Sequence, residues 1–258
     1  MAVFNFSIDQ LQMFFLVFLR VGAIMFTVPV FDSRSIPAIF KAGLAVAVSL
    51  VLFPVLNPLE LPPARGVIPF ALGVVGEIAM GVTIGLSVKL IFAGIQLAGQ
   101  MAGFQMGFAI VNVMDPVTSD QVSIIAQLKN LMAMLMFITI NAHHWFLRAI
   151  VDSFRLVPPF GFQLSNSLAD HIIRLGCNMF IIAVKVGAPV MAALLLTSAA
   201  LGLIARTVPQ MQIFIVAMPL KIIVGLMFLA FSLPVISWFL RHVFDGLGND
   251  ILTLLKAI

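Results

Sequence analysis

Six long apolar segments constrain the fold of this chain more than any other feature of its sequence. They are Leu11–Phe31, Ile39–Leu56, Val67–Ala98, Leu131–Val151, Ile172–Ala205 and Ile213–Leu240. A bilayer core about 30 Å thick is crossed by about 20 helical residues. The first, second and fourth segments fit one crossing each. The other three are longer, so they must tilt, break or leave the bilayer.

Composition leaves too little polar surface for a soluble fold. Of the 258 residues, 62% are hydrophobic and 9% are charged, whereas soluble chains average about 45–50% and about 25%. These proportions exclude a soluble monomer, a disordered chain and a disulfide-rich secreted module. The sequence predicts an all-α integral membrane protein. The first segment lacks a basic flank and a small-residue cleavage site, so we expect it to be retained.

Prolines lie inside the longest segments and between the others. Pro189 lies in the fifth segment, and Pro219 and Pro234 lie in the sixth. Each removes one helical hydrogen bond, so interruptions are expected there. Loops are expected at residues 32–37, 57–69, around 115–116, and 158–166. The pattern predicts long, kinked helical hairpins.

Seven charged residues lie within the apolar segments, and only one of them is acidic: Arg20, Lys41, Glu77, Lys89, Lys185, Arg206 and Lys221. An ionised group at the bilayer centre costs roughly 2.5–3.5 kcal/mol on insertion scales. Glu77 can neutralise one or two cations, so the others need carboxylates from other subunits, backbone carbonyls, lipid phosphates or water. Snorkelling to the interface is the alternative for the cations near segment ends. The imbalance predicts partner subunits.

Glycines recur at intervals of four residues, at Gly81 and Gly85 and again at Gly99, Gly103 and Gly107. On a helix such glycines share one face and allow another backbone to approach closely. Close helix packing is therefore expected at Gly81, Gly85 and Gly99. The alternative is that glycine is simply common in membrane helices.

The stretch from Phe104 to Pro116 is apolar but only about a dozen residues long. It is too short to cross a bilayer, which favours a re-entrant or pore-inserted loop. Gln96, Gln100 and Gln105 precede it, and their amide groups suit a protein-lined or wet cavity. The alternative is an ordinary buried connection that ends in the turn at Asp115 and Pro116.

Motifs for catalysis, metal binding or nucleic-acid binding do not occur in the sequence. His143 and His144 are adjacent, so on a helix they point about 100° apart and cannot chelate one metal together. HExxH and GxSxG are absent. The 14 Lys and Arg residues form no basic run. We expect no enzymatic activity, no catalytic residue, no metal, no cofactor and no nucleic-acid partner.

The order of several short motifs resembles the FliR/SctT family, core subunits of type III protein export gates. The matching residues span nearly the whole chain: Arg20-Val-Gly, Pro29-x-Phe31, Ile36-Pro37, Lys41-Ala-Gly-Leu, Gly76-Glu77, Asp115-Pro116, RTVPQ at 206–210, and Pro219-x-Lys221. The stretch from Gly187 to about Pro234 is similar to the small FliQ-type gate subunit. The resemblance implies one export-gate domain, with a hairpin part at residues 1–171 and a FliQ-like part at 172–258.

The resemblance implies a subunit of the flagellar export gate in the bacterial inner membrane, at the basal body. It would assemble with FliP-type and FliQ-type subunits into a channel for unfolded export substrates. Further partners would be an FlhB-type switch subunit, an FlhA-type export subunit and membrane lipid.

In this family a hydrophobic loop plugs the closed channel, and by position that loop is about residues 103–116 here. The implied plug residues are Phe104, Met106, Phe108, Ile110, Val113 and Met114. The implied hinges are Gly103, Gly107 and Pro116. The implied contacts with neighbouring subunits are the charged residues Glu77, Lys89, Lys185, Arg206 and Lys221.

Two other functions fit parts of the same pattern. A polytopic secondary transporter would bind a small solute at broken helices. A purely structural assembly subunit would need the subunit contacts but not the plug.

Overall fold

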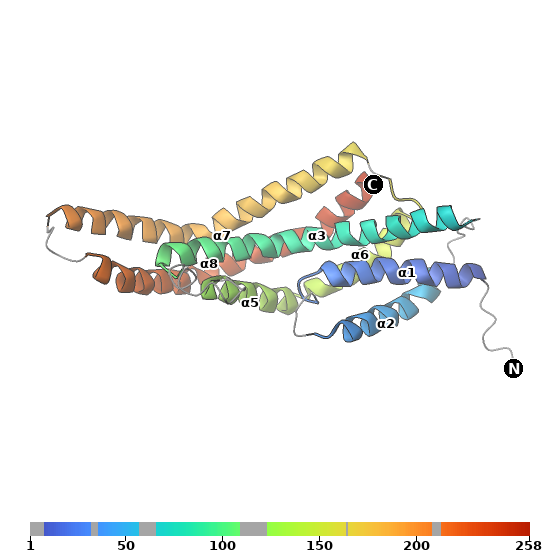
Figure 1. Ribbon diagram of the computed structural model, residues 1–258, viewed down its shortest axis with the longest axis horizontal. Helices are drawn as coiled ribbons and strands as arrows, with labels where there is room; N and C mark the ends of the chain where they lie inside the picture. The colour runs from blue at the N-terminus through green and yellow to red at the C-terminus, as the bar shows by residue number, and fades with distance from the viewer. Residues whose placement is uncertain (1–7, 32–35, 57–65, 109–122, 164, 208–212) are drawn as a thin grey trace. The chain divides into compact units, whose positions relative to one another are not determined.

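The fold is entirely helical in the part of the chain that can be described. The computed structural model describes residues 8–31, 36–56, 66–108, 123–163, 165–207 and 213–258, and none of these is in a strand. The helices are α1 (Ile8–Thr27), α2 (Ala38–Leu56), α3 (Val67–Met106), α5 (Ile124–Thr139), α6 (Ala142–Leu156), α7 (Asn166–Thr207) and α8 (Ile213–Ala257) (Figure 1). The expected all-α fold is confirmed.

Five described helices are long and apolar enough to cross a membrane, namely α1, α2, α3, α7 and α8. The last three have 40, 42 and 45 residues, about twice the length that one crossing needs. α7 runs through Pro189, and α8 runs through Pro219 and Pro234. Both helices continue past their prolines, so the prolines do not divide the fifth and sixth apolar segments.

The fourth apolar segment is not one helix. α5 ends at Thr139 and α6 begins at Ala142. Between them, Asn141 has a φ of 57°, in the left-handed region that asparagine adopts more easily than most residues. The expected single crossing over Leu131–Val151 is therefore wrong, because this backbone turn divides it.

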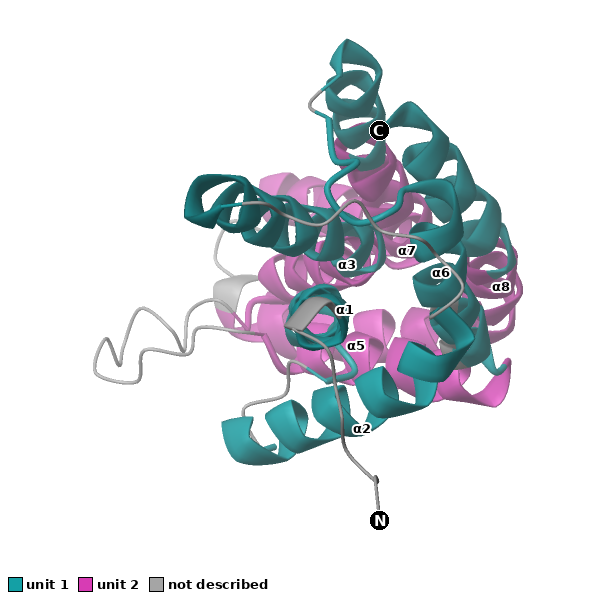
Figure 2. Cartoon of the chain, turned by 90° about the vertical axis from the view of Figure 1, so that its right-hand side faces the viewer, with its two compact units in different colours: residues 1–90, 141–175, 245–258 teal, residues 91–140, 176–244 magenta. Residues whose placement is uncertain are grey.

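The chain forms two compact units, each built from stretches that are distant in sequence (Figure 2). Unit 1 contains residues 1–90, 141–175 and 245–258, and unit 2 contains residues 91–140 and 176–244. α3, α7 and α8 each contribute to both units. The division at residue 172 implied by the family resemblance falls inside α7, which continues through it, and stays a prediction.

The core of unit 1 is built on one face of α1. Its buried residues recur every three or four positions, as one helical stripe requires: Met13, Leu16, Val17, Arg20, Val21, Ile24 and Met25. On α2, Phe53 meets Phe14 of α1 edge to face, with ring centroids 5.9 Å apart. An arginine lies in the middle of this apolar stripe and needs a partner.

The core of unit 2 contains three phenylalanines and a separate apolar cluster. The rings of Phe92, Phe137 and Phe244 lie 5.3–5.8 Å apart. The second group, which we call the Met106 cluster, consists of Ala102, Met106, Ile125, Val190, Leu194 and Leu229. It joins the end of α3 to α5, α7 and α8.

Much of the apolar surface remains uncovered by the chain itself. Only 17% of the most apolar stretch of α8 is buried, against 61% of that of α3. Large side chains such as Leu196, Phe231 and Trp238 are exposed. In water such a surface would be unstable, so these faces require lipid or other protein.

Candidate functional site

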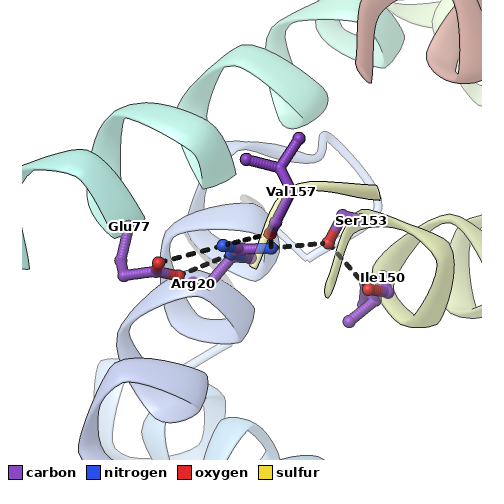
Figure 3. A network of polar contacts seen from close by, with 5 residues as sticks. All are labelled: Arg20, Glu77, Ile150, Ser153 and Val157. Atoms are coloured by element: carbon purple, nitrogen blue, oxygen red, sulfur yellow. Dashed lines mark hydrogen bonds and ion pairs between the residues drawn. The ribbon is translucent and has the colours of Figure 1, made fainter. Parts of the chain in front are cut away.

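A buried ion pair joins α1 to α3 within unit 1. Arg20 Nε lies 2.5 Å from Glu77 Oε2, and Arg20 Nη2 lies 2.9 Å from Glu77 Oε1 (Figure 3). The two side chains are 1% and 2% exposed. The contact is bidentate, which is the strong geometry for a guanidinium and a carboxylate.

The end of α6 completes the surroundings of Arg20. Nη1 donates to Ser153 Oγ at 3.2 Å, and Nη1 and Nη2 both donate to the carbonyl of Val157, at 3.1 and 3.2 Å. Val157 directly follows α6, so the cation lies at the negative end of that helix. The ring of Phe154 is 4.0 Å from Arg20 Cζ.

All five N–H donors of Arg20 are used in these contacts. The sequence identified Glu77 as the acidic member of the charged set but not which cation it pairs with. Glu77 pairs inside its own chain, and its expected contact with a neighbouring subunit stays a prediction.

Two glycines of α3 allow α1 to come close to α3 beside the ion pair. A Cβ added at Gly81 would lie 2.6 Å from Ala23 Cβ and 2.7 Å from the carbonyl oxygen of Arg20. One added at Gly85 would lie 2.5 Å from Thr27 Cβ. A larger residue would separate the helices and lengthen the hydrogen bonds of the ion pair.

A second site lies in unit 2, where α3 ends. Gly107 has a φ of 94°, which residues with a Cβ rarely adopt. Its N–H donates to the Phe104 carbonyl at 3.1 Å, and the N–H of Phe108 donates to the Gly103 carbonyl at 3.0 Å. These two bonds form a Schellman motif, which ends a helix and fixes the direction of the chain after it.

The start of α5 contacts the same place on α3. Ser123 is the N-cap of α5 and accepts a hydrogen bond from the N–H of Ile125 at 3.3 Å. Its Oγ lies where a Cβ on Gly103 would be, and the backbone of Ala126 lies where a Cβ on Gly99 would be. Both described flanks of residues 109–122 therefore contact Gly103.

The expected plug residues fall into different surroundings. Phe104 and Met106 belong to α3 rather than to a loop; Phe104 is 66% exposed and Met106 is fully buried. Met106 lies close to Gly225 of α8, and Phe108 packs against the Met106 cluster. Ile110, Val113, Met114 and the expected hinge Pro116 lie outside the described residues.

The expected contact cations are mostly at the surface. Lys185 is exposed and lies 5.4 Å from the Phe239 ring. Arg206 is exposed in the last turn of α7, and Lys89 is exposed on α3. Lys221 is half-buried. These placements leave the charged groups at least partly accessible to other molecules.

One buried cation was missed by sequence reasoning. Lys129 of α5 is 4% exposed, and its Nζ donates to the Val186 carbonyl at 3.2 Å. The fourth apolar segment of the sequence begins at Leu131, so Lys129 falls outside it. Ser123, a good N-cap residue before an apolar run, is the signal that could have moved that boundary.

Metal chemistry finds no support in the described part of the chain. Across those residues, no group of three or more His, Cys, Asp or Glu side chains is arranged to hold an ion. The charged centre of unit 1 consists of one arginine and one glutamate in contact, which is an arrangement for holding helices together.

Known proteins match this chain over almost its full length. Residues 11–247 match the family described as bacterial export proteins, family 1. The chain is 37% identical to the flagellar biosynthetic protein FliR of Bacillus subtilis, with 93% of each chain covered. It is 35% identical to FliR of Pectobacterium carotovorum, over 97% of this chain and 96% of the relative. It is 31% identical to FliR of Escherichia coli, over 97% of both.

Proposed function

Because this chain belongs to the bacterial export proteins of family 1 and is 31–37% identical to three flagellar FliR proteins, we propose that it is a core subunit of the flagellar export gate in the bacterial inner membrane. It is a membrane component of the flagellar export apparatus, with five apolar helices. In that apparatus it is a structural or transport component rather than an enzyme. It works with other export-gate proteins.

The proposed partners are FliP-type and FliQ-type subunits, which with this chain form the channel, and FlhB-type and FlhA-type subunits. The charges of unit 2 support an assembly. Its described residues include Lys129, Lys185, Arg206, Lys221 and Arg241 but neither aspartate nor glutamate. Carboxylates on neighbouring subunits would offset the exposed members of this set. The uncovered apolar faces of α7 and α8 would supply the contact surface.

The proposed plug rests on one observation, the shared contact at Gly103. The N–H of Phe108 donates to the Gly103 carbonyl, and Ser123 packs against the Cα of Gly103, so the two described flanks of residues 109–122 meet at one point of α3. Flanks that meet in this way favour the proposal that the residues between them act as one plug. Residues 109–114 are Ala-Ile-Val-Asn-Val-Met. Such side chains can close a pore by excluding water, and methionine can deform when the pore reopens.

The loop is tested by replacing Ile110, Val113 and Met114 together with serine. We expect increased ion leakage across the membrane of cells that carry the variant, because polar side chains no longer exclude water. The matched control exchanges the same residues for apolar ones of similar size, Ile110→Val, Val113→Ile and Met114→Leu, and should keep the seal. Unchanged leakage and export in the serine variant, at normal amounts of protein, would contradict the plug.

The two other functions make different predictions. A solute transporter would take up its substrate as a purified single chain, and it would use broken helices; α7 and α8 run unbroken through their prolines. A purely structural subunit would tolerate the serine substitutions in the loop. The leakage measurement therefore also separates the gate from the structural subunit.

A further inference from the structure

A cavity of about 580 Å³ lies within unit 2. Helices α3, α5, α7 and α8 form its wall, and ten of its twelve lining residues are apolar, including Ile95, Met132 and Leu233. The two polar ones are Ser237 and Lys129. The Ser237 hydroxyl already donates to the Pro234 carbonyl at 2.9 Å, which leaves the lysine as the group that distinguishes this cavity.

Lys129 brings a positive charge into the wall of an apolar cavity. Its ammonium group has three N–H donors, and the Val186 carbonyl accepts one at 3.2 Å. The described residues of unit 2 include no carboxylate. A buried ion without a counter-ion costs several kcal/mol. The cavity therefore favours an occupant that carries a negative charge.

The size of the cavity limits what can enter it. An α-helix with its side chains is about 10–12 Å wide and rises about 1.5 Å per residue, so 580 Å³ would hold about one turn of a partner helix. The same volume lies within the range of small-molecule sites, about 300–1,000 Å³. A narrow flexible ligand fits where a helix does not.

Exposed apolar side chains of α5 adjoin the cavity. Leu135 lines the cavity and is 57% exposed. Leu131 and Ile138, four residues before and three after it on α5, are also exposed. An apolar ligand could therefore enter from lipid without crossing a polar surface.

We propose that this cavity binds the single acyl chain of a membrane fatty acid, with its carboxylate paired to Lys129. The acyl chain lies along Met132, Leu229 and Leu233, and the carboxylate receives N–H donors that the Val186 carbonyl does not use. The site goes beyond the proposed gate function, and it does not depend on the loop at residues 109–122.

The test uses the purified full-length chain in nanodiscs of zwitterionic lipid, with isotope-labelled palmitate as the probe. Hexadecanol has the same chain length without the charge. We expect hexadecanol to compete with the labelled palmitate about tenfold more weakly than unlabelled palmitate does, because a charge-assisted hydrogen bond is lost. Equal competition by palmitate and hexadecanol in the unaltered protein would overturn the proposal, whatever the variants do.

Two variants and one control locate the site. Lys129→Gln should weaken palmitate binding about tenfold and remove its advantage over hexadecanol. Leu233→Trp keeps the lysine but fills the cavity, so binding of both probes should be lost. Arg241→Gln removes an exposed cation of the same unit and should bind palmitate normally. Unaltered affinity in Lys129→Gln would contradict the site.

A partner carboxylate is the competing occupant, and the assembled complex tests it. A diazirine-bearing palmitate should crosslink to α5 and α8 in the complex as it does in the single chain. If carbodiimide instead joins Lys129 to an acidic residue of another subunit, and palmitate no longer crosslinks, the fatty-acid proposal is wrong.

Discussion

Arg20 and Glu77 form a bidentate ion pair in the interior of unit 1, with both side chains at most 2% exposed. The pair joins α1 to α3, and Arg20 also binds the last residues of α6 through Ser153 and Val157. One guanidinium therefore fixes three helices that are far apart in the sequence. The two charges neutralise each other, which leaves the remaining cations of the apolar segments to other partners.

Removing one member of the ion pair should destabilise the protein more than removing both. We expect Glu77→Gln to lower the free energy of unfolding by about 3–5 kcal/mol, because it leaves Arg20 buried without an anion. The double variant Arg20→Leu with Glu77→Leu should recover most of that loss. Denaturant unfolding in detergent measures both. The exposed Arg174→Gln is the control, and a double variant no more stable than Glu77→Gln would contradict this account.

Glycine at position 81 should be required for the approach of α1 to α3. In Gly81→Ala the added methyl would lie 2.6 Å from Ala23 Cβ, so we expect a loss of about 1–3 kcal/mol from overpacking. Gly43→Ala on α2 is the matched control, because nothing lies within 4 Å of its Cβ position. It should be neutral or stabilising, since alanine favours helix over glycine. Equal effects of the two substitutions would argue against close packing.

The sequence predicted the apolar helices well because their signals are local. The buried stripe of α1 follows helical spacing. The long apolar segments expected to begin at Val67, Ile172 and Ile213 are α3, α7 and α8, which begin at Val67, Asn166 and Ile213. The partner of Arg20 could not be predicted, because Glu77 is 57 positions away and several cations compete for it. Such a choice depends on tertiary packing.

The boundaries of the helices were predicted less well, as three places show. The left-handed residue Asn141 divides a continuous apolar run, which no hydrophobic pattern reveals. Lys129 fell just outside the segment drawn from apolarity alone, although it is buried inside α5. α3 likewise extends to Met106, so Phe104 and Met106 of the expected plug stretch belong to a helix.

The end of α3 should depend on glycine at position 107. Gly107→Ala forces a residue with a Cβ into a φ of 94°, at a cost of about 1–2 kcal/mol. We expect the loop beyond it to shift and ion leakage in cells to rise. Gly202→Ala is the control, a glycine of α7 with nothing within 4 Å of its Cβ position. Leakage that is equally low in both variants would show that this cap does not position the seal.

Charge reversal of a contact cation should affect assembly more than folding. We expect Lys221→Glu to co-purify with less of its partner subunits, because a like charge then faces their carboxylates. An acidic-to-basic change in the partner should restore recovery. Arg155→Glu, an exposed change on α6 of unit 1, should co-purify normally. If Lys221→Glu retained its partners at normal levels, position 221 would not be a contact.

We propose that this chain works only as one subunit of a larger export gate. The most direct measurement is the intact mass of the tagged protein after gentle extraction in mild detergent. We expect a defined complex with FliP-type and FliQ-type subunits and little of the single chain. A stable solitary chain that supports export after reconstitution in lipid would contradict the account.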